Sequence, residues 1–322
     1  MKVKSINLIS LNWCNSKCLG CKIYTNTDNH KFISNEMLVA LFQHDEFTEV
    51  EDIGFSGGEP MLHPDLERVI ETIILKNKSL LTFFFNTNAT AGKERIIKIV
   101  RNFACKVPQF HLLVSVDGNR ETYKYTRGID NFNRCVELLK SLSELKSEIS
   151  NLRVGISATL FKKTATVENL NYLVNLSAEL NVDFTFRFAD VGEMFYNNIS
   201  NKDEIVVEDS QKLNLMTHSK VLGVESDFIK WQKEEIETGI NPVMKNKANE
   251  LVCRAGELFV FLDANGDIYP CHLSNRKIGN YQTGITKRNL LLGGMHEPCP
   301  CLTECTAYPQ EIFGKKYPKN EN

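Results

Sequence analysis

Residues 14–21 read CNSKCLGC, and this stretch decides the fold that we predict for the whole chain. It places Cys14, Cys18 and Cys21 in a C-x3-C-x2-C pattern, directly after a short apolar run at residues 5–12. Three thiolates can hold three irons of a [4Fe–4S] cluster, whose usual complement is four cysteines. The fourth iron would then be open to a ligand, as a coordination site is in catalytic metal centres generally. Zinc binding, or buried thiols without a metal, are the alternatives.

The composition of the chain is that of an ordinary soluble globular protein. Of its 322 residues, 42% are apolar and 24% are charged, which is enough for a large core and one or two domains. The net charge of −2 gives no sign of nucleic-acid binding, and no apolar run approaches the ~20 residues of a membrane span. We therefore expect neither a nucleic acid nor a membrane as a partner.

The cysteine count and the first residues bear on localisation. The chain reaches an apolar, strand-like run by Ile6, which leaves no room for a signal peptide. Its ten cysteines gather toward the two ends, and this fits metal ligation in a reducing compartment better than disulfides. A cytoplasmic protein is the expectation.

Apolar runs alternate with amphipathic stretches through the first two thirds of the chain. Leu66, Ile70 and Ile73, for example, recur with the spacing of a helix that faces a core. Six strands that alternate with helices imply an α/β fold with a parallel sheet and right-handed crossovers. The predicted strands are 5–12, 51–55, 80–86, 110–116, 152–161 and 182–189, and the predicted helices are 34–44, 66–74, 94–103, 132–145 and 167–180.

A second motif follows the second predicted strand, where residues 56–60 read SGGEP. Two glycines at the end of a strand allow positive φ angles and a close approach of the backbone to a ligand. Free backbone N–H and C=O groups at such a turn can hold a small polar group. On these residues alone, a tight connection between a strand and a helix remains the alternative.

The cysteine pattern resembles the signature of the radical S-adenosylmethionine (radical SAM) enzymes, and residues 57–60 resemble their GGEP motif. The resemblance implies a partial (β/α)6 TIM-like barrel over residues 1–191, with the chemistry at the C-terminal ends of the strands. It also implies that the open iron binds the amino and carboxylate groups of SAM, which is then cleaved reductively to methionine and a 5′-deoxyadenosyl radical. Such an enzyme requires an external one-electron reductant, such as flavodoxin or ferredoxin.

The same resemblance implies further SAM-binding residues. Gly57, Gly58, Glu59 and Pro60 would bind the SAM amino group. The usual aromatic residue before the third cysteine is replaced by Gly20, and Tyr24 is the candidate to compensate for it.

Two more contacts are expected after the fourth predicted strand. Ser115 and Asp117 resemble an S-x-D pattern that hydrogen-bonds the SAM ribose, and a simple turn is the alternative. Arg127 resembles an arginine that pairs with the SAM carboxylate, a task to which a guanidinium fork is suited. A surface salt bridge is the alternative for Arg127.

Residues 192–250 are more polar and read as a connector. We expect a loop over the barrel mouth at residues 196–211 and a helix at 228–237. Loops on a rigid scaffold often carry specificity, so this region is a candidate for substrate contacts.

Cysteines gather again toward the C-terminal end. Cys253 and Cys271 bracket two short strands, 258–262 and 267–269, whose D-A-N-G connection predicts a hairpin. A hairpin returns the chain, so both cysteines can ligate one cluster. His272 reads as a surface group or as one that supports the ligands.

Three further cysteines complete this C-terminal group. With them, the arrangement resembles the SPASM/twitch extension of radical SAM enzymes, in its smaller twitch form with one auxiliary [4Fe–4S] cluster. We expect this domain at residues 251–308 and a tail at 309–322. Cys301 and Cys305 are the preferred remaining ligands, because one helical turn puts residues four apart on one face, and Cys299 is the spare. A zinc site is the alternative.

The predicted function is therefore that of a radical SAM enzyme that abstracts a hydrogen atom from a small polar substrate, such as a sugar or aminocyclitol. Two-electron oxidation is preferred, with the auxiliary cluster accepting an electron. Radical epimerisation, in which Cys299 returns a hydrogen atom, is the second possibility. Peptide modification is a third, disfavoured because the chain starts at the first barrel strand without an N-terminal peptide-binding domain. A non-catalytic iron–sulfur electron-transfer protein is the rival from another class.

Overall fold

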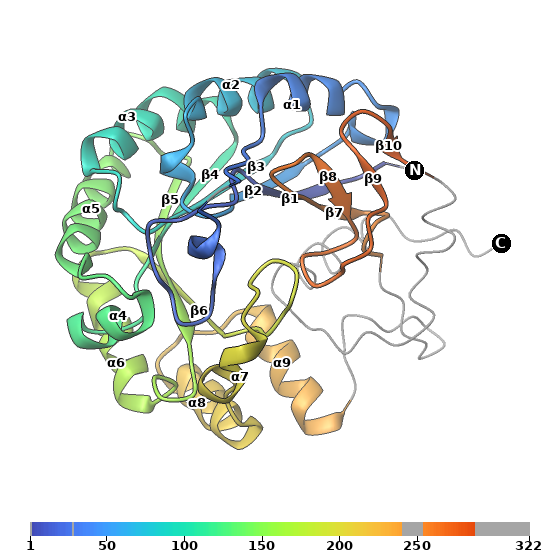
Figure 1. Ribbon diagram of the computed structural model, residues 1–322. Helices are drawn as coiled ribbons and strands as arrows, with labels where there is room; N and C mark the ends of the chain where they lie inside the picture. Colours follow the sequence, from blue (N-terminus) through green and yellow to red (C-terminus); the bar gives the residue numbers. More distant parts are fainter. Residues whose placement is uncertain (1, 28, 240–253, 287–322) are drawn as a thin grey trace.

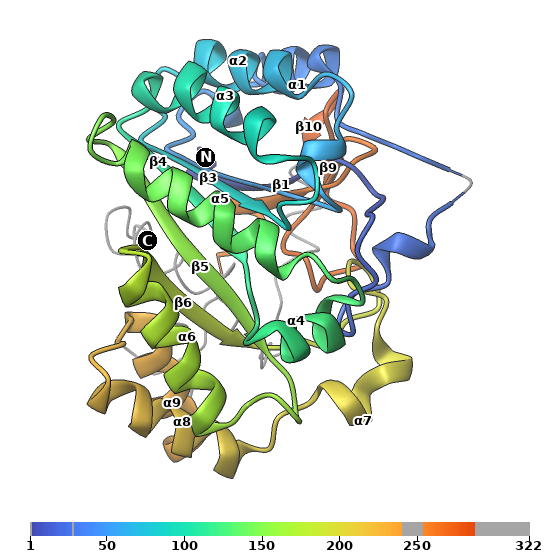
Figure 2. The same ribbon diagram turned by 90° about the vertical axis from the view of Figure 1, so that its left-hand side faces the viewer.

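The computed structural model describes residues 2–27, 29–239 and 254–286, which form an open α/β barrel (Figure 1). The strands belong to one sheet with the order β10-β9-β8-β7-β1-β2-β3-β4-β5-β6. Neighbours from β1 to β6 pair in parallel, which confirms the predicted fold class. Helices α1 to α6 lie outside the strands in an arc, and in the second view α5 crosses over β4 and β5 (Figures 1 and 2).

The strands are β1 (Ser5–Ile9), β2 (Asp52–Ser56), β3 (Thr82–Thr87), β4 (Gln109–Ser115), β5 (Leu152–Leu160), β6 (Asp183–Phe188), β7 (Phe259–Leu262), β8 (Asp267–Tyr269), β9 (Gly279–Asn280) and β10 (Gly284–Ile285). The α-helices are α1 (Asn35–Leu41), α2 (Leu66–Lys76), α3 (Lys93–Phe103), α4 (Arg120–Arg127), α5 (Phe132–Leu145), α6 (Val167–Glu179), α7 (Lys202–Ile205), α8 (Asp209–Val221) and α9 (Asp227–Thr238). Short 3-10 turns are η1 (Ile23–Thr25), η2 (Asp45–Phe47), η3 (Pro60–Leu62), η4 (Ala104–Lys106) and η5 (Ile199–Asn201). All six predicted barrel strands and the five predicted barrel helices are present. Each observed boundary lies within three residues of the predicted one.

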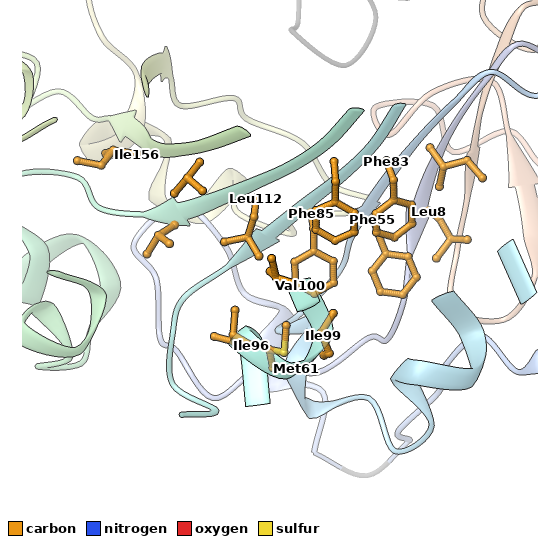
Figure 3. Packing of buried hydrophobic residues seen from close by; sticks show 14 of the residues in the cluster. Leu8, Phe55, Met61, Phe83, Phe85, Ile96, Ile99, Val100, Leu112 and Ile156 are labelled. Carbon is orange, nitrogen blue, oxygen red and sulfur yellow. The ribbon is translucent and has the colours of Figure 1, made fainter. Parts of the chain in front are cut away.

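The outer face of the sheet carries the main hydrophobic core. Side chains alternate between the two faces of a strand, so every second residue points toward the helices. Phe55, Phe83 and Phe85 are fully buried there, with the rings of Phe55 and Phe85 stacked at 5.6 Å between centroids. Ile96 and Val100 of α3 pack in the same cluster, as Figure 3 shows.

The inner face of the sheet mixes polar side chains with apolar ones such as Phe84 and Leu113, and it surrounds a cavity of about 750 Å³. Residues from six neighbouring strands line it, among them Asn7, Ser56, Asn86, Ser115, Ser157 and Thr185. Barrels of parallel strands usually fill this space with bulky apolar side chains. Here the inward side chains include glycine, serine, threonine and asparagine, which leave room for a ligand, and a cavity of this size lies in the range of small-molecule sites.

The segment 254–286 extends the barrel sheet. The predicted hairpin is confirmed, because β7 and β8 pair antiparallel. β7 also pairs in parallel with β1, with Ser5 opposite Phe259 and Leu8 opposite Leu262, and this places the hairpin beside the cysteine loop. The boundaries predicted for the connector and for the C-terminal domain stay predictions.

Two expectations about the fold were incomplete. Helix α4 was missed because its sequence is polar and buries only Tyr123 and Thr126, so it shows no apolar stripe. The loop expected at residues 196–211 is partly wrong, since α7 and the start of α8 fall within it. The helix expected at residues 228–237 is confirmed as α9. No helix among the residues described is long and apolar enough to cross a membrane.

Asp52 gives the fold a pH-dependent stability. Burial on the inner face raises the pKa of this carboxyl from 3.8 to about 6, although the Ser5 hydroxyl donates a hydrogen bond of 2.8 Å to it. Between these two values the folded chain holds a proton that the unfolded chain has lost, so stability falls as pH rises through this window. We expect the metal-free wild type to lose about 1–3 kcal/mol relative to Asp52→Asn between pH 4 and pH 7. Urea unfolding of both proteins measures this difference in unfolding free energy. Profiles of stability against pH that run parallel for the two proteins would contradict the prediction.

Candidate active site

The three cysteines of the first motif line the barrel cavity together. Cys14, Cys18 and Cys21 lie in the loop between β1 and η1, and each is partly buried. The backbone N–H of Ser16 donates to the Cys14 sulfur at 3.5 Å, which fixes the first turn of the loop. The structure thus brings the three thiols to the C-terminal end of the barrel strands, as predicted.

Burial sets the protonation of these thiols. Desolvation raises the pKa of Cys14 and of Cys21 to about 12, and it raises the pKa of Cys18 as well. A metal would reverse this, because a coordinating thiol is deprotonated outright. Three sulfur donors on one loop, open to a cavity on one side, fit a [4Fe–4S] cluster with three protein ligands. Within the described residues no three ligating side chains converge on a single metal ion, and a cluster does not require this because it spreads its ligands over several irons.

The Gly-Gly turn after β2 packs directly against the cysteine loop. The Gly58 N–H donates to the Leu11 carbonyl at 2.9 Å, and the Glu59 N–H to the Trp13 carbonyl at 3.3 Å. A Cβ at residue 58 would fall on the Trp13 carbonyl, so only glycine fits there. Gly57, Gly58, Glu59 and Pro60 all line the cavity. The two motifs therefore form one structural unit.

The Glu59 carboxylate joins the ends of β2 and β3. One oxygen accepts from the Thr87 hydroxyl at 2.7 Å and from the Met61 N–H at 3.2 Å, and the other accepts from the Asn88 N–H at 2.7 Å. Burial raises the pKa of Glu59 to about 7 against these hydrogen bonds. Its contacts give Glu59 the role of holding the turn in place.

Two asparagines hold the cysteine loop, and the sequence analysis missed both roles. The Asn88 amide donates to the Ser16 hydroxyl at 2.7 Å and lies 3.8 Å from the Cys14 sulfur. The fully buried Asn198 donates to the Gly20 carbonyl at 2.8 Å. The position of Asn88 after β3 was the one sequence signal for a role at the site. Asn198 comes from the polar connector, where no sequence signal pointed to such a role.

Asp117 and Arg127 form a buried ion pair in the same cavity. Their closest atoms, the Asp117 Oδ1 and the Arg127 Nη2, are 2.6 Å apart, and Oδ1 also accepts from the Thr159 N–H at 2.8 Å. The positive charge of Arg127 opposes the effect of burial on the pKa of the Cys18 thiol. In the described part of the chain, the second Asp117 oxygen has no partner although it is buried. Ser115, at the end of β4, lines the cavity beside them.

The barrel with its two motifs matches a known protein family. Residues 8–159 match the model of the Radical SAM superfamily, and this match spans β1 to β5 with both motifs. This barrel belongs to the radical SAM superfamily. Members of this superfamily use a [4Fe–4S] cluster and SAM.

Three relatives illustrate the relationship. A probable GTP 3′,8-cyclase of Methanocaldococcus jannaschii is 22% identical over 240 residues, which is 71% of this chain and 76% of the cyclase. The structure of Streptococcus suis SuiB bound to S-adenosylmethionine is similar with a TM-score of 0.63 and 15% identity, over 97% of this chain and 68% of SuiB. The structure of anSMEcpe with bound AdoMet has a TM-score of 0.60 and 19% identity, over 89% and 80% of the two chains.

One departure of this radical SAM chain from its superfamily has a structural counterpart. A Cβ at Gly20 would lie 2.6 Å from ring carbon Cε1 of Phe161, which follows β5. Phe161 therefore occupies the space that a side chain at residue 20 would need. Phe161 and Tyr24 both line the cavity.

Of the ligands predicted for an auxiliary cluster, only Cys271 lies within the described residues. It is buried and follows β8. Cys253, Cys299, Cys301 and Cys305 lie outside the described residues. Of the two expectations for the neighbouring His272, a surface position is wrong, since its side chain is buried and lines the barrel cavity, and a role in supporting the ligands stays a prediction. Burial, and next the charge of Arg187, lower the pKa of His272 to about 4.

Proposed function

We propose that this chain binds SAM at the cysteine loop and abstracts a hydrogen atom from a small polar substrate held in the same cavity. The observation that carries the proposal is that the three thiols, the Gly-Gly turn and the Asp117–Arg127 pair all line one cavity. When bound, the cluster supplies the electron that cleaves SAM to methionine and a 5′-deoxyadenosyl radical. The protein's own part is to hold both molecules and exclude water.

We assign the SAM end of the cavity to four groups of the chain. The turn at Gly57 and Gly58 offers backbone groups to the amino group of SAM. Arg127, beside Cys18, offers its guanidinium to the carboxylate. The open oxygen of Asp117 can accept from a ribose hydroxyl. Phe161 fills the place beside Gly20 and is our candidate for the contact with adenine.

Asp117 and Arg127 should therefore both be needed for SAM affinity. Losing one charge-assisted hydrogen bond costs roughly 1.5–3 kcal/mol, so we expect about 10- to 150-fold weaker SAM binding for Asp117→Asn and for Arg127→Ala. Equilibrium binding of SAM to the reconstituted proteins measures this. Arg120→Ala is the matched control, because its exposed ion pair with Asp130 lies outside the cavity. Wild-type affinity in a variant would reject the role of that residue.

A small polar substrate suits the rest of the cavity. Beyond the SAM end, Asn7 and Thr185 offer hydrogen bonds among apolar side chains such as Phe84, and the whole cavity measures about 750 Å³. The relative named as a GTP cyclase would also act on a small polar molecule, which supports this choice. Modification of a peptide is the second candidate, since SuiB has been crystallised with its precursor peptide.

We propose two-electron oxidation as the reaction. A hydrogen atom moves from a substrate carbon to the deoxyadenosyl radical and gives 5′-deoxyadenosine. The substrate radical then loses one electron to an iron–sulfur acceptor and one proton to water, which turns a carbinol carbon into a ketone. Cys271 is our proposed ligand for an auxiliary [4Fe–4S] cluster as that acceptor, with an external one-electron reductant feeding the first cluster. Epimerisation remains the alternative.

The test uses reduced, reconstituted protein with SAM and fractions of an extract from cells that make it. We expect the small-molecule fraction, and not the peptide fraction, to raise the rate of 5′-deoxyadenosine formation above the substrate-free rate. Mass spectrometry of the responsive fraction should then show a product two hydrogens lighter. Stimulation by the peptide fraction alone would favour peptide modification, and an isomeric product with deuterium from deuterated water would favour epimerisation.

A further inference from the structure

His272 is a buried imidazole whose ring nitrogens find no hydrogen-bond partner among the described residues. Its side chain is 4% exposed and lines the barrel cavity. Across the described residues, neither ring nitrogen has a hydrogen-bond partner. Native structures rarely leave a buried donor or acceptor without a ligand or water to supply the hydrogen bond. A polar molecule bound in the cavity would give both nitrogens of His272 hydrogen-bond partners.

Aromatic rings surround this imidazole on the side of the C-terminal hairpin. The ring of Tyr196 meets that of His272 edge-on at 5.8 Å between centroids, and the ring of Phe261 lies at 6.4 Å. Phe195 packs edge-on against Phe261 at 5.5 Å. These three rings, which we call the aromatic wall, all line the cavity. The wall offers apolar ring surface next to a hydrogen-bonding group.

His272 also lies close to the reaction centre. Arg187, at the end of β6, acts electrostatically on both Cys21 and His272. The backbone N–H of Lys22, next to Cys21, donates to the Tyr196 carbonyl at 2.8 Å. A molecule held between His272 and the aromatic wall would therefore stand beside the cysteine loop, within the same cavity.

We propose that His272 is a substrate-binding residue, and that its imidazole hydrogen-bonds hydroxyl groups of a polyhydroxylated ring that lies against the aromatic wall. An imidazole carries one donor and one acceptor, which matches a pair of neighbouring hydroxyls. The C–H face of such a ring is apolar and packs on the faces of aromatic side chains, as in many sites that combine aromatic surface with a few polar groups. This inference rests on the proposed function and names its substrate class.

The experiment compares wild type, His272→Ala and His272→Gln, each reconstituted and reduced. The probe is the small-molecule fraction of the cell extract, and the readout is 5′-deoxyadenosine formed from SAM. The iron content and the substrate-free rate of each variant are measured as well, and stimulation is expressed relative to that variant's own substrate-free rate. The amount of fraction needed for half-maximal stimulation should rise about 10-fold or more in His272→Ala, the factor expected for one lost hydrogen bond, and less in His272→Gln. His218→Gln, at a histidine outside the cavity, is the matched control and should behave as wild type.

A second arm tests the substrate class. Polymer-bound periodate cleaves neighbouring hydroxyls, so treating the fraction with it should abolish stimulation, whereas protease treatment should not. The proposal would be overturned if wild type and His272→Ala gave the same stimulation curve. It would also be overturned if the fraction still stimulated wild type after periodate treatment, or if no fraction stimulated wild type. Loss of iron in His272→Ala would instead make His272 a cluster ligand and also overturn it. Failure of the proposed function is distinguishable, because wild type would then form no 5′-deoxyadenosine at all.

Discussion

Replacing Cys14, Cys18 and Cys21 together by alanine is expected to abolish SAM cleavage and to lower the iron content by about four per chain, the content of one [4Fe–4S] cluster. The chain should stay folded, because the hydrophobic core lies on the outer face of the sheet and these side chains line the inner cavity. Iron analysis, 5′-deoxyadenosine formation and far-UV circular dichroism measure the three outcomes.

The control for this prediction is Cys105→Ala, since Cys105 is exposed and outside the cavity. It should keep the iron and the activity of wild type. Unchanged iron content in the triple variant would contradict the assignment of these cysteines, and zinc in place of iron after anaerobic preparation would favour the zinc alternative.

Gly58→Ala is expected to have the second largest effect. Its Cβ would overlap the Trp13 carbonyl, a backbone atom of the cysteine loop that cannot move without shifting Cys14. Overpacking of this kind costs typically 1–3 kcal/mol of stability, and more where backbone must move. Because the same turn is proposed to bind the SAM amino group, we also expect SAM to bind at least ~10-fold more weakly, which corresponds to about 1.4 kcal/mol.

Gly239→Ala is the control that separates the effect of this clash from the effect of replacing a glycine in general. Gly239 ends α9 with a φ of +69°, and a Cβ there would meet nothing within 4 Å. This control should lose about 1 kcal/mol through its backbone conformation and keep SAM affinity. Urea unfolding and SAM binding of both variants decide the matter. A Gly58→Ala protein that binds SAM as wild type does would show that the turn is not part of the SAM site.

The sequence predicted those parts of the fold and site whose signals are local. Alternating apolar runs identified the strands from β1 to β6, and the spacing of Cys14, Cys18 and Cys21 identified the loop that reaches the cavity. The hairpin of β7 and β8 was also predicted from its turn. Its parallel pairing with β1 was not, because no local pattern states which distant strand a hairpin joins.

The missing parts depend on tertiary contacts. Asn88 and Asn198 are common residue types at ordinary positions, and only the fold shows that their amides hold the cysteine loop. His272 follows a cysteine and was predicted to be a surface group or one that supports the ligands, and only the fold shows that it lines the cavity. Helix α4 escaped prediction because a polar helix that buries two side chains has no apolar periodicity.

The central claim is that this chain cleaves SAM at the loop of Cys14, Cys18 and Cys21. The most direct measurement is anaerobic incubation of the reconstituted, dithionite-reduced protein with SAM, followed by quantification of 5′-deoxyadenosine and methionine. We expect both products to form in equal amounts, slowly even without substrate. The triple alanine variant should form neither. A reduced, iron-replete wild type that forms no 5′-deoxyadenosine would contradict it.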